Sequence, residues 1–599
     1  MPKRLIIAEK REQAEGYAKA LGRPKKVGDS YVVSDELHIA YCAGHLFGIV
    51  NDALESYKNV ESLPLFPKFN DYEFDYSPTQ ETSLLKLKER LFKNIKKEVS
   101  WCDEIVIGTD GDREGESIFY TMINKIPGAQ SKIKYRLWVG TATKAGIKKA
   151  YENLKFPEET YGFFLAADAR RKADWLIGVA NLTPFMRHKL KELGQLSEKK
   201  VKGKKVFEKI SVGRVLLPIM KIILEREREI RNHHPQKYWK IELTDEFQTN
   251  FTSDLIFGGE ENSLGIEDAK SVFQSLEKET QVSSIIQKEE TVKAPPLFNL
   301  TNLQTYMSKN HGLSSDETQK TAEGLRLREG GEDGYLSYPR TDSVHISQDE
   351  FLYLKAKLND FKNLIDINFE AVNLKPRKKY VNDTKTNPHY ALIPTETLPD
   401  LNKLSAIERT VYEQVVKRML LMFAPDQKVA KTTIKLNLLD QTIEFKAIGT
   451  QILEEGWAQL EGKTTSDKVL PSYKEGQVIQ ITPELKEDIT KPPKLHNEET
   501  LLKRMKKYYI GTSSTRADAI KRLKKEKYLS VNKKGQFETT EKSRKIIEYL
   551  EKIDSKFLDL EMTGNWELVL KLIEEGSHEF TPQDFLEQVQ QEIRQTLKG

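Results

Sequence analysis

The chain has 599 residues, of which 38% are hydrophobic and 31% charged, and its formal net charge is +5. This length predicts about four domains, and the hydrophobic content is sufficient for their cores. The sequence has no apolar run of about 18 residues, which excludes a membrane-spanning helix. Glu9 and Glu12 stand too early for a secretory signal peptide. Cys42 and Cys102 are too few for a disulfide framework or a four-cysteine zinc site, so we expect a cytoplasmic protein without zinc.

Basic residues concentrate in two segments of the chain. Residues 491–550 contain 17 Lys and Arg against 7 Asp and Glu, and residues 186–215 contain 10 against 3. Either segment alone is typical of a solvated, lysine-rich surface. Together with the acidic motif at residues 110–114, they favour a polyanionic partner, namely nucleic acid.

An acidic loop follows a strand-like run near residue 105. Residues 105–108 are apolar and mostly β-branched, which predicts a buried strand of a parallel sheet, and Asp110, Asp112 and Glu114 follow it. Open α/β sheets place their sites in such loops. Because the three acids alternate, we expect their carboxylates to converge, and oxygen ligands alone favour Mg²⁺. A solvated acidic turn is the alternative interpretation.

Residues 1–155 alternate between strand-like and helical runs, which predicts an α/β domain. Glu9 and Lys10 follow the first predicted strand, so that a second acidic strand end lies in the same sheet. His45 follows another strand, where it is either a site residue or an ordinary turn histidine. The predicted strands are Leu5–Ala8, Tyr31–Val33, His38–Tyr41, Ile105–Gly108 and Lys134–Trp138, and the predicted helices are Glu12–Leu21, Glu81–Lys96 and Ser117–Ile126.

Residues 156–230 have mainly helical periodicity. One predicted helix carries Arg170, Arg171 and Asp174. Arginine suits bidentate phosphate contacts, and a salt-bridge cluster on the helix surface is the alternative. The lysine-rich segment Lys189–Lys209 is predicted to be a loop.

Two hydroxyl-containing turns precede predicted helices. Ser211 and Arg214 open the helix predicted at Leu216–Ile230, and a Ser-x-Gly-Arg sequence there offers backbone N–H groups and a guanidinium to a phosphate. The second turn lies near the C-terminus, where hydroxyls and a helix start are standard phosphate contacts and an N-cap run is the alternative. Its residues are Ser513, Ser514, Thr515 and Arg516.

Two stretches with strand-like alternation, residues 236–290 and 429–482, are separated by a mainly helical segment. This arrangement predicts one discontinuous β-rich domain into which residues 297–425 are inserted. Residues 456–464 resemble a phosphate-binding P-loop, but five residues instead of four separate the glycines, and Glu461 would face the phosphates. We therefore expect no ATP site.

The inserted helical segment contains the sequence Tyr338-Pro339-Arg340. A residue before proline is pushed towards extended backbone, so this turn can display the Tyr338 side chain with Arg340 on the same side. Chemistry alone does not distinguish Tyr338 from an ordinary turn tyrosine. His389 precedes a further helix or strand. The helices predicted in this segment are Leu300–Lys309 and Ser315–Arg328.

In order along the chain, these motifs resemble those of the type IA DNA topoisomerases, most closely bacterial topoisomerase III. The matching motifs are Ala8-Glu9-Lys10, Gly44-His45-Leu46, Asp110-Gly111-Asp112-Arg113-Glu114-Gly115, Ala173-Asp174-Trp175, Ser211-Val212-Gly213-Arg214-Val215, Tyr338-Pro339-Arg340-Thr341-Asp342-Ser343, His389 to Thr395 and Gly511 to Ala517. Their order is far more specific than any single motif. The chain departs from the family at Leu216, where a glutamine is usual, and at Ser513 and Arg516. Leu216 cannot make a glutamine's hydrogen bonds, so one local DNA contact is expected to be missing.

The resemblance implies a multidomain fold of α/β and α-helical parts. Its parts are an N-terminal Toprim domain, helical winged-helix-like domains and a discontinuous β-rich arch, which together form a toroid. The expected divisions are the Toprim domain with the catalytic acids and Mg²⁺ at 1–155, a helical DNA-binding domain at 156–230 and 483–599, the arch at 231–295 and 426–482, and a helical domain with the nucleophilic tyrosine at 296–425.

The resemblance also implies an ATP-independent, Mg²⁺-dependent enzyme that cleaves one DNA strand through a 5′-phosphotyrosine, passes a strand and religates. It would relax negative supercoils, decatenate DNA, or both. The implied catalytic residues are Tyr338 as nucleophile, Glu9 as general acid, Lys10 and Arg340 as cations at the phosphate, and His389. The implied metal ligands are Glu9, Asp110, Asp112 and Glu114, and the implied DNA contacts are His45, Arg170, Arg171, Asp174, Ser211, Arg214, Ser513, Ser514, Thr515 and Arg516.

The implied partners are single-stranded or underwound duplex DNA, a helicase and a single-strand binding protein, with the enzyme acting as a monomer and no membrane involved. Two other classes of protein use part of the same sequence. A Toprim nuclease or primase-like enzyme would use the acids without Tyr338. A non-enzymatic single-strand binding protein would use the basic segments without the acids.

Overall fold

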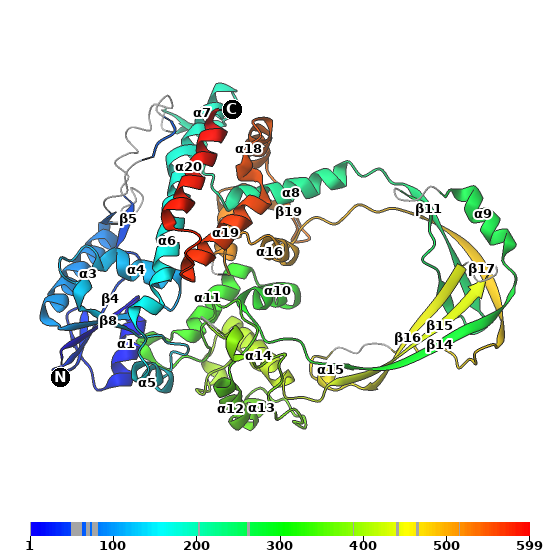
Figure 1. Cartoon of the computed structure of the whole chain (residues 1–599), viewed down its shortest axis with the longest axis horizontal. Helices are drawn as coiled ribbons and strands as arrows, with labels where there is room; N and C mark the ends of the chain where they lie inside the picture. Colours follow the sequence, from blue (N-terminus) through cyan, green and yellow to red (C-terminus); the bar gives the residue numbers. More distant parts are fainter. Residues whose placement is uncertain are drawn as a thin grey trace.

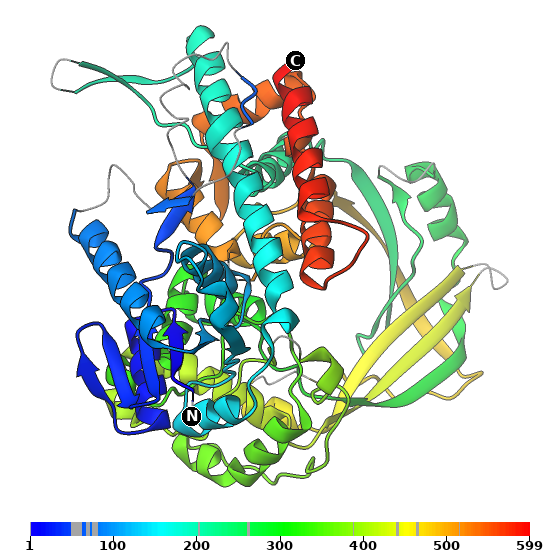
Figure 2. The same cartoon turned by 60° about the vertical axis from the view of Figure 1, so that its left-hand side comes forward.

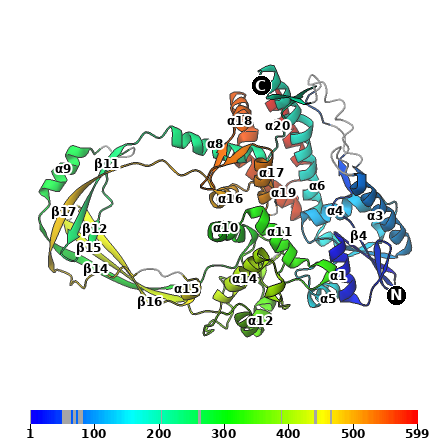
Figure 3. The ribbon, with the colours of Figure 1, turned by 180° about the vertical axis from the view of Figure 1, so that it is seen from behind.

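The structure, a computed structural model, describes residues 2–49, 63–66, 72–74, 82–201, 204–259, 264–386, 389–438, 443–462, 467–513 and 515–598. The chain forms a ring, in which a long arch leaves a compact body and returns to it (Figures 1 and 3). Within the described ranges, no helix combines the length and the hydropathy needed to cross a membrane.

The N-terminal domain is a six-stranded sheet between two layers of helices. Its strand order is β2-β3-β4-β1-β7-β8, in which β4, β1, β7 and β8 run parallel. The strands are β1 (Arg4–Ala8), β2 (Lys25–Val27), β3 (Ser30–Ser34), β4 (Leu37–Tyr41), β7 (Glu104–Gly108) and β8 (Ile133–Arg136). One face is covered by α1 (Arg11–Leu21) and α5 (Lys144–Glu152), and the other by α3 (Thr82–Trp101) and α4 (Arg113–Ile123). A separate two-stranded antiparallel sheet pairs β5 (Phe47–Ile49) with β6 (Tyr72–Phe74).

Strands β1 and β7 lie at the centre of this sheet and are buried on both faces. Apolar runs of this kind are expected where helices cover both faces of a parallel sheet. The register pairs Ala8 with Gly108, so the carboxyl ends of the two strands lie side by side. The predicted strands and helices of this domain are confirmed, with shifts at two helices. Helix α3 continues to Trp101, beyond its predicted end at Lys96. Helix α4 begins before its predicted start at Ser117, because the Asp112 side chain accepts a hydrogen bond from Gly115 N (2.8 Å) and caps the helix.

Two distant segments of the chain build one helical domain around a shared apolar core. The first segment contributes α6 (Tyr161–Asp174), a π-helical stretch (Trp175–Leu182), α7 (Thr183–Glu192) and α8 (Leu216–Arg231). The second contributes α16 (Glu498–Lys507), α17 (Arg516–Lys525), β18 (Leu529–Val531), β19 (Phe537–Thr539), α18 (Glu541–Lys552), α19 (Leu560–Glu574) and α20 (Pro582–Lys598). Helices α6 and α20, from the two segments, pack together (Figure 2).

The lysine-rich segment Lys189–Lys209 is not a loop, and that prediction was wrong. Helix α7 continues to Glu192, and β9 (Glu198–Val201) then pairs antiparallel with β10 (Lys204–Phe207). Val201, Val206 and Phe207 supply strand propensity, which the surrounding lysines conceal in the sequence pattern.

The arch is one seven-stranded antiparallel sheet that interleaves strands from two segments of the chain, in the order β12-β16-β15-β14-β17-β11-β13. Its elements are β11 (Lys237–Asp245), β12 (Asn250–Thr252), β13 (Phe257–Gly258), α9 (Ile266–Ser275), β14 (Glu279–Val292), β15 (Gln427–Leu438), β16 (Ile443–Glu454), α15 (Trp457–Leu460) and β17 (Val478–Ile489). Helix α9 ends at Ser275, shortly before β14 begins at Glu279. Val292 pairs with Gln427, so the chain leaves the arch and re-enters it at neighbouring positions.

The segment between Val292 and Gln427 folds into a helical domain with its own core, which we call the tyrosine-bearing domain. In Figure 1 it lies between the N-terminal domain and the arch. Its helices are α10 (Leu300–His311), α11 (Ser315–Arg326), α12 (Gln348–Ala356), α13 (Leu358–Leu364) and α14 (Ala406–Leu421). Short 3₁₀ turns occur at Gln130–Lys132, Pro157–Glu159, Glu329–Gly331, Asp383–Lys385, Leu401–Lys403 and Lys556–Leu558. The domain boundaries given for the sequence stay a prediction, which the separate cores support.

His496 gives the helical domain a pH-dependent stability. Its side chain is buried next to Arg226 and Arg504, and burial first, then these cations, lower its pKa to about 4. A histidine whose pKa is lower in the folded than in the unfolded state makes stability depend on pH. The full stability is present above the pKa of the unfolded state, about 6.5, and it decreases as pH falls towards 4, because the unfolded state then binds the proton more readily. We expect the wild type to lose up to about 3 kcal/mol over this range and His496→Gln to lose less. Thermal unfolding of both proteins between pH 7.5 and 4.5 (about three units) tests this, and parallel curves would contradict it.

Candidate active site

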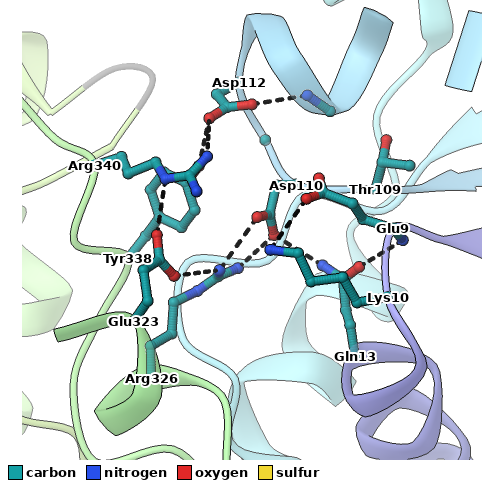
Figure 4. A network of polar contacts seen from close by, with 12 residues as sticks. Glu9, Lys10, Gln13, Thr109, Asp110, Asp112, Glu323, Arg326, Tyr338 and Arg340 are labelled. Carbon is teal, nitrogen blue, oxygen red and sulfur yellow. Dashed lines mark hydrogen bonds and ion pairs between the residues drawn. The ribbon is translucent and has the colours of Figure 1, made fainter. Parts of the chain in front are cut away.

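The side chains singled out at the two strand ends meet the tyrosine at the junction of two domains. Glu9 follows β1 and Asp110 follows β7, on neighbouring parallel strands. The tyrosine-bearing domain docks on the same edge, where Tyr338 N donates to Gly140 O (3.1 Å) and Thr141 pairs with Ser337. Figure 4 shows Tyr338 and Arg340 facing the acids of the N-terminal domain.

Arg136 holds the backbone of the acidic loop in place through hydrogen bonds to its carbonyl groups. It is fully buried and forms an ion pair with the fully buried Glu116 (2.8 Å). Its guanidinium also donates to Thr109 O (2.8 Å) and Asp110 O (2.6 Å). Gly115 closes the loop, because a Cβ there would lie 2.1 Å from Asp110 O. Sequence reasoning missed Arg136, and its one signal was a lone arginine within an otherwise strand-like run.

Replacing Arg136 by methionine is expected to destabilise the N-terminal domain by about 3–5 kcal/mol, because the substitution leaves the buried Glu116 carboxylate without its counter-charge. Calorimetric unfolding of the variant measures this loss. Adding Glu116→Gln to Arg136→Met removes the unpaired charge and is expected to restore part of the stability. An Arg136→Met variant as stable as the wild type would show that the ion pair does not hold the loop.

The carboxylates of Asp110, Asp112 and Glu114 do not converge on one point, contrary to expectation. Asp110 binds Arg326, Asp112 accepts from the Tyr338 hydroxyl, and Glu114 binds His45. Asp112 heads helix α4 and Glu114 lies in its first turn, so the helix turns the two side chains in different directions. Among the residues that the structure describes, no three acidic, histidine or cysteine side chains form a ready metal site.

Glu9 is an acid of the site with one carboxylate oxygen that accepts no hydrogen bond. Its carboxylate is buried, Lys10 Nζ lies 3.2 Å from Oε1, and Oε2 has no hydrogen-bond partner. Burial and the neighbouring charge of Asp110 raise the pKa of Glu9 to about 7, against the opposing effect of Lys10. Gln13 fixes the strand end, because its side chain accepts from Glu9 N (2.8 Å) and donates to Asp110 Oδ1 (2.9 Å).

Tyr338 is buried, and its hydroxyl donates to Asp112 Oδ2 (2.5 Å). The Arg326 guanidinium lies 4.3 Å from the centre of its ring, and the ring of His389 lies 4.2 Å from it. Burial, Asp112 and Asp110 raise the pKa of Tyr338 well above its ordinary value. In this closed arrangement the phenol is therefore firmly protonated, and its nearest proton acceptor is a carboxylate of the other domain.

Cations balance the acids at the junction. Arg340 Nη1 lies 3.8 Å from Asp112, and Arg340 Nε pairs with Glu323 Oε1 (2.9 Å). Glu323 also lies 3.5 Å from Arg326. Sequence reasoning selected Arg340 and missed Arg326 and Glu323, which sit on the predicted helix before the tyrosine motif and carry no local signal.

His389 contacts the acidic loop directly. Its Nε2 lies 2.6 Å from Gly111 O, between the two aspartates of the loop, and its ring stacks on Trp138. Burial lowers the pKa of His389 to about 4, so the ring is neutral at physiological pH and donates its Nε2–H to the carbonyl.

His45 and two arginines of α6 form a second polar group beside the loop. His45 Nε2 binds Glu114 (2.8 Å), and its Nδ1 lies 2.9 Å from Arg171 Nη1. Arg170 lies 4.0 Å from Glu114. Burial would raise the pKa of Glu114, but the hydrogen bond from His45 outweighs it and lowers that pKa to about 2. Glu114 is thus a bound anion of this group.

Two predicted phosphate contacts are turned into the protein instead of outward. Arg214 is 2% exposed, donates to Asp174 Oδ1 (2.9 Å) and lies 3.6 Å from Glu567. Arg516 is also buried and donates to Ile510 O (3.2 Å). Acids from distant segments pair with Arg214, and a carbonyl six residues away accepts from Arg516, so neither guanidinium faces solvent in the DNA-free structure.

The predicted hydroxyl contacts are similarly occupied. Ser211 N donates to the Tyr528 hydroxyl (2.7 Å), and the Ser211 hydroxyl accepts from Arg522. Thr515 Oγ1 accepts from Thr512 N (2.9 Å), and Ser513 is buried. Ser514 lies outside the described residues. The hydroxyls of Thr512 and Thr515 also lie within hydrogen-bond distance of each other (3.1 Å), just before helix α17.

A family model described as DNA topoisomerase matches residues 158–587, and a Toprim domain model matches residues 4–139. The chain belongs to the DNA topoisomerase family. The topoisomerase is 29% identical to a DNA topoisomerase 3 of Staphylococcus epidermidis, in a match that covers 98% of this chain and 80% of the relative. A DNA topoisomerase 3 of Staphylococcus aureus strain USA300 is 27% identical, with coverage of 96% and 79%.

The fold agrees with this membership. Full-length topoisomerase I from Thermotoga maritima superposes with a TM-score of 0.71 at 22% identity, covering 99% of this chain and 90% of that one. The topoisomerase is therefore a type IA enzyme with an N-terminal Toprim domain, and its activity is the cleavage and passage of DNA strands. A Toprim nuclease or primase is not favoured.

Proposed function

We propose that Tyr338 is the nucleophile of this topoisomerase and that it cleaves one DNA strand at the junction seen in Figure 4. The observation that carries the proposal is the meeting of the Tyr338 hydroxyl with Asp112 across two domains, 2.5 Å apart. Attack of Tyr338 Oη on a phosphorus forms a bond to the 5′-phosphate and breaks the bond to the 3′-oxygen. The intermediate conserves the energy of the phosphodiester, so religation needs no ATP.

Two acids are placed to move the protons. Asp112 Oδ2 accepts the hydrogen bond from the Tyr338 hydroxyl and takes its proton as Oη attacks. Glu9, with a pKa of about 7 and an unpaired Oε2, is protonated often enough at neutral pH to donate to the leaving 3′-oxygen and to take the proton back on religation. Lys10 and Arg340 flank these groups and supply positive charge to the phosphate in the transition state.

The donor set fits a divalent cation such as Mg²⁺. The charges of Asp110 and Asp112 both raise the pKa of Glu9, and Glu9 keeps a buried oxygen without a partner. Such oxygen-only donors suit a hard ion. When bound there, Mg²⁺ would supply positive charge that positions the cut 3′ end. Glu114 is committed to His45, so we assign it to support of the loop instead of to the metal.

We further propose that single-stranded or underwound DNA reaches Tyr338 past Arg170 and Arg171, the arginines closest to the acidic loop on α6. The predicted contacts at Ser211, Arg214, Ser513 and Arg516 need rearrangement of the helical domain before they meet a phosphate. We propose decatenation as a task beside relaxation. We place the enzyme in the cytoplasm as a monomer, acting with a helicase and a single-strand binding protein.

Incubation with negatively supercoiled plasmid, Mg²⁺ and no ATP tests this function. We expect relaxed topoisomers from the wild type, and a protein-linked 5′ end after detergent treatment. Chelation of Mg²⁺ before the reaction is expected to stop religated products from forming. Nicked or linear DNA without a covalent protein adduct would contradict the proposal and favour a nuclease.

A further inference from the structure

Arg326 is a strongly bound cation at the junction that the cleavage steps above do not use. It is the last residue of α11, in the tyrosine-bearing domain, and is 2% exposed. Its Nη2 donates to Asp110 Oδ1 (2.7 Å), and its Nη1 lies 3.3 Å from Asp110 Oδ2. The pair therefore crosses from one domain to the other, and both members are buried (Figure 4).

Arg326 is bound directly to Asp110. Burial alone would raise the pKa of Asp110, but the Arg326 guanidinium, with smaller effects from Lys10 and Arg340, holds that pKa well below its usual range. Asp110 Oδ1 also accepts from Gln13, so both carboxylate oxygens are in use. The guanidinium in turn depends on Asp110, because its Nε is buried without a partner and Glu323 is farther away, at 3.5 Å.

The same carboxylate belongs to the donor set that fits a divalent cation, so this inference rests on the proposed metal site. If a metal ion bound Asp110 while Arg326 kept its two contacts with the same carboxylate, two positive charges would share one buried site. Repulsion between like charges is strong there. While both oxygens of Asp110 contact the guanidinium, a cation on the same carboxylate would meet that positive charge at short range. The unpaired Oε2 of Glu9 marks the side from which a cation would gain a further ligand.

We propose that Arg326 is the resident counter-ion of Asp110 in the metal-free enzyme and that a divalent cation binds Asp110 only as Arg326 withdraws. Because the two residues belong to different domains, the exchange also removes a contact that holds the junction closed. Binding of the cation and separation of the tyrosine-bearing domain then favour each other, as any two linked equilibria must. The Tyr338 ring, which lies against Arg326, moves with the same domain.

Mg²⁺ binding to the full-length, DNA-free protein tests the exchange by isothermal titration calorimetry. Arg326→Gln removes the competing charge, and we expect it to bind Mg²⁺ about ten-fold more tightly or better, since a like charge in a buried site costs at least that factor. Arg328→Gln is the matched control. Arg328 forms an ion pair with Glu408 (2.8 Å) and lies over the ring of Tyr335, away from Asp110. The Mg²⁺ affinity of Arg328→Gln is therefore expected to equal that of the wild type.

The outcomes separate the inference from the proposed function. Equal, measurable affinities in Arg326→Gln and the wild type would overturn the inference and leave the metal site intact. Weaker binding in Arg326→Gln would also overturn it, because Arg326 would then be positioning Asp110 for the metal. Absence of Mg²⁺ binding in every protein would overturn both.

A second measurement covers the case in which Arg326→Gln folds poorly. Without metal this variant leaves Asp110 buried and unpaired, so Mg²⁺ is expected to raise its unfolding temperature more than that of the wild type. Arg326→Lys keeps one positive charge without the two-pronged contact, and its Mg²⁺ affinity is expected to lie between the two. An Arg326→Lys affinity at or below the wild-type value would count against the exchange.

Discussion

Tyr338→Phe is expected to reduce plasmid relaxation below roughly one part in 10⁴ of the wild-type rate, a loss of about 5.5 kcal/mol in transition-state stabilisation. The phenyl ring keeps its contacts with Arg326 and His389 and lacks only the oxygen that would form the covalent bond. Asp112 retains the hydrogen bond from Gly115 N and the nearby Arg340. The free energy of unfolding is therefore expected to change by no more than about 1.5 kcal/mol.

Tyr335→Phe is the matched control for this variant. Tyr335 lies three residues earlier, against Arg328 and Tyr412 in the core of the tyrosine-bearing domain, and its substitution is expected to leave relaxation unchanged. Binding of a single-stranded oligonucleotide, measured by fluorescence anisotropy, should be similar for both variants and the wild type. Relaxation by Tyr338→Phe at a rate near the wild type would remove Tyr338 from the chemistry.

Glu9→Gln is expected to slow cleavage by about 10²–10⁴-fold, because the variant has no proton to give to the leaving 3′-oxygen. The substitution is nearly isosteric, and the backbone of residue 9 stays fixed by Gln13. The rate is measured as formation of the covalent adduct on a single-stranded oligonucleotide. A substrate whose bridging 3′-oxygen is replaced by sulfur separates proton donation from other roles, since a thiolate leaves without a proton.

On the sulfur substrate, Glu9→Gln is expected to cleave within about ten-fold of the wild type. Glu15→Gln on helix α1 is the control, because the Glu15 carboxylate pairs with Lys19 and accepts from Tyr31, neither of which takes part in the proposed cleavage. This variant should behave as the wild type on both substrates. An equal defect of Glu9→Gln on the oxygen and sulfur substrates would contradict a proton-donating role and favour a purely electrostatic one.

The elements that position the site followed from sequence where periodicity and strand ends carried the information. The pairing of Glu9 with Asp110 follows from two apolar strands that each end in an acid, and the inserted tyrosine-bearing segment follows from two β-rich stretches around helices. The outward orientation expected for Arg214 did not hold in the DNA-free structure. Its neutralising partners are Asp174 and Glu567, and the second lies too far along the chain for any local pattern to reveal.

Buried charges account for most of what the sequence concealed at the site. Arg136 and Arg326 look like ordinary surface residues in a strand and at a helix end, yet both are buried on partners in other elements. A pattern of apolar residues shows which face of an element is covered, but it does not show which charges are covered with it. The divergence of the three loop acids has the same origin, because each carboxylate follows its own counter-charge.

The pairing of Val292 with Gln427 has a consequence for the two ends of a cut DNA strand. Both chain connections of the tyrosine-bearing domain leave the arch at this pair of residues. The domain is therefore linked covalently to the arch as well as held by its contacts at the junction. Once a strand is cut, one end is covalently fixed to Tyr338 and the other rests on the N-terminal domain, as proposed above. Even with the junction fully parted, the two broken ends stay on a single polypeptide and cannot diffuse away from each other.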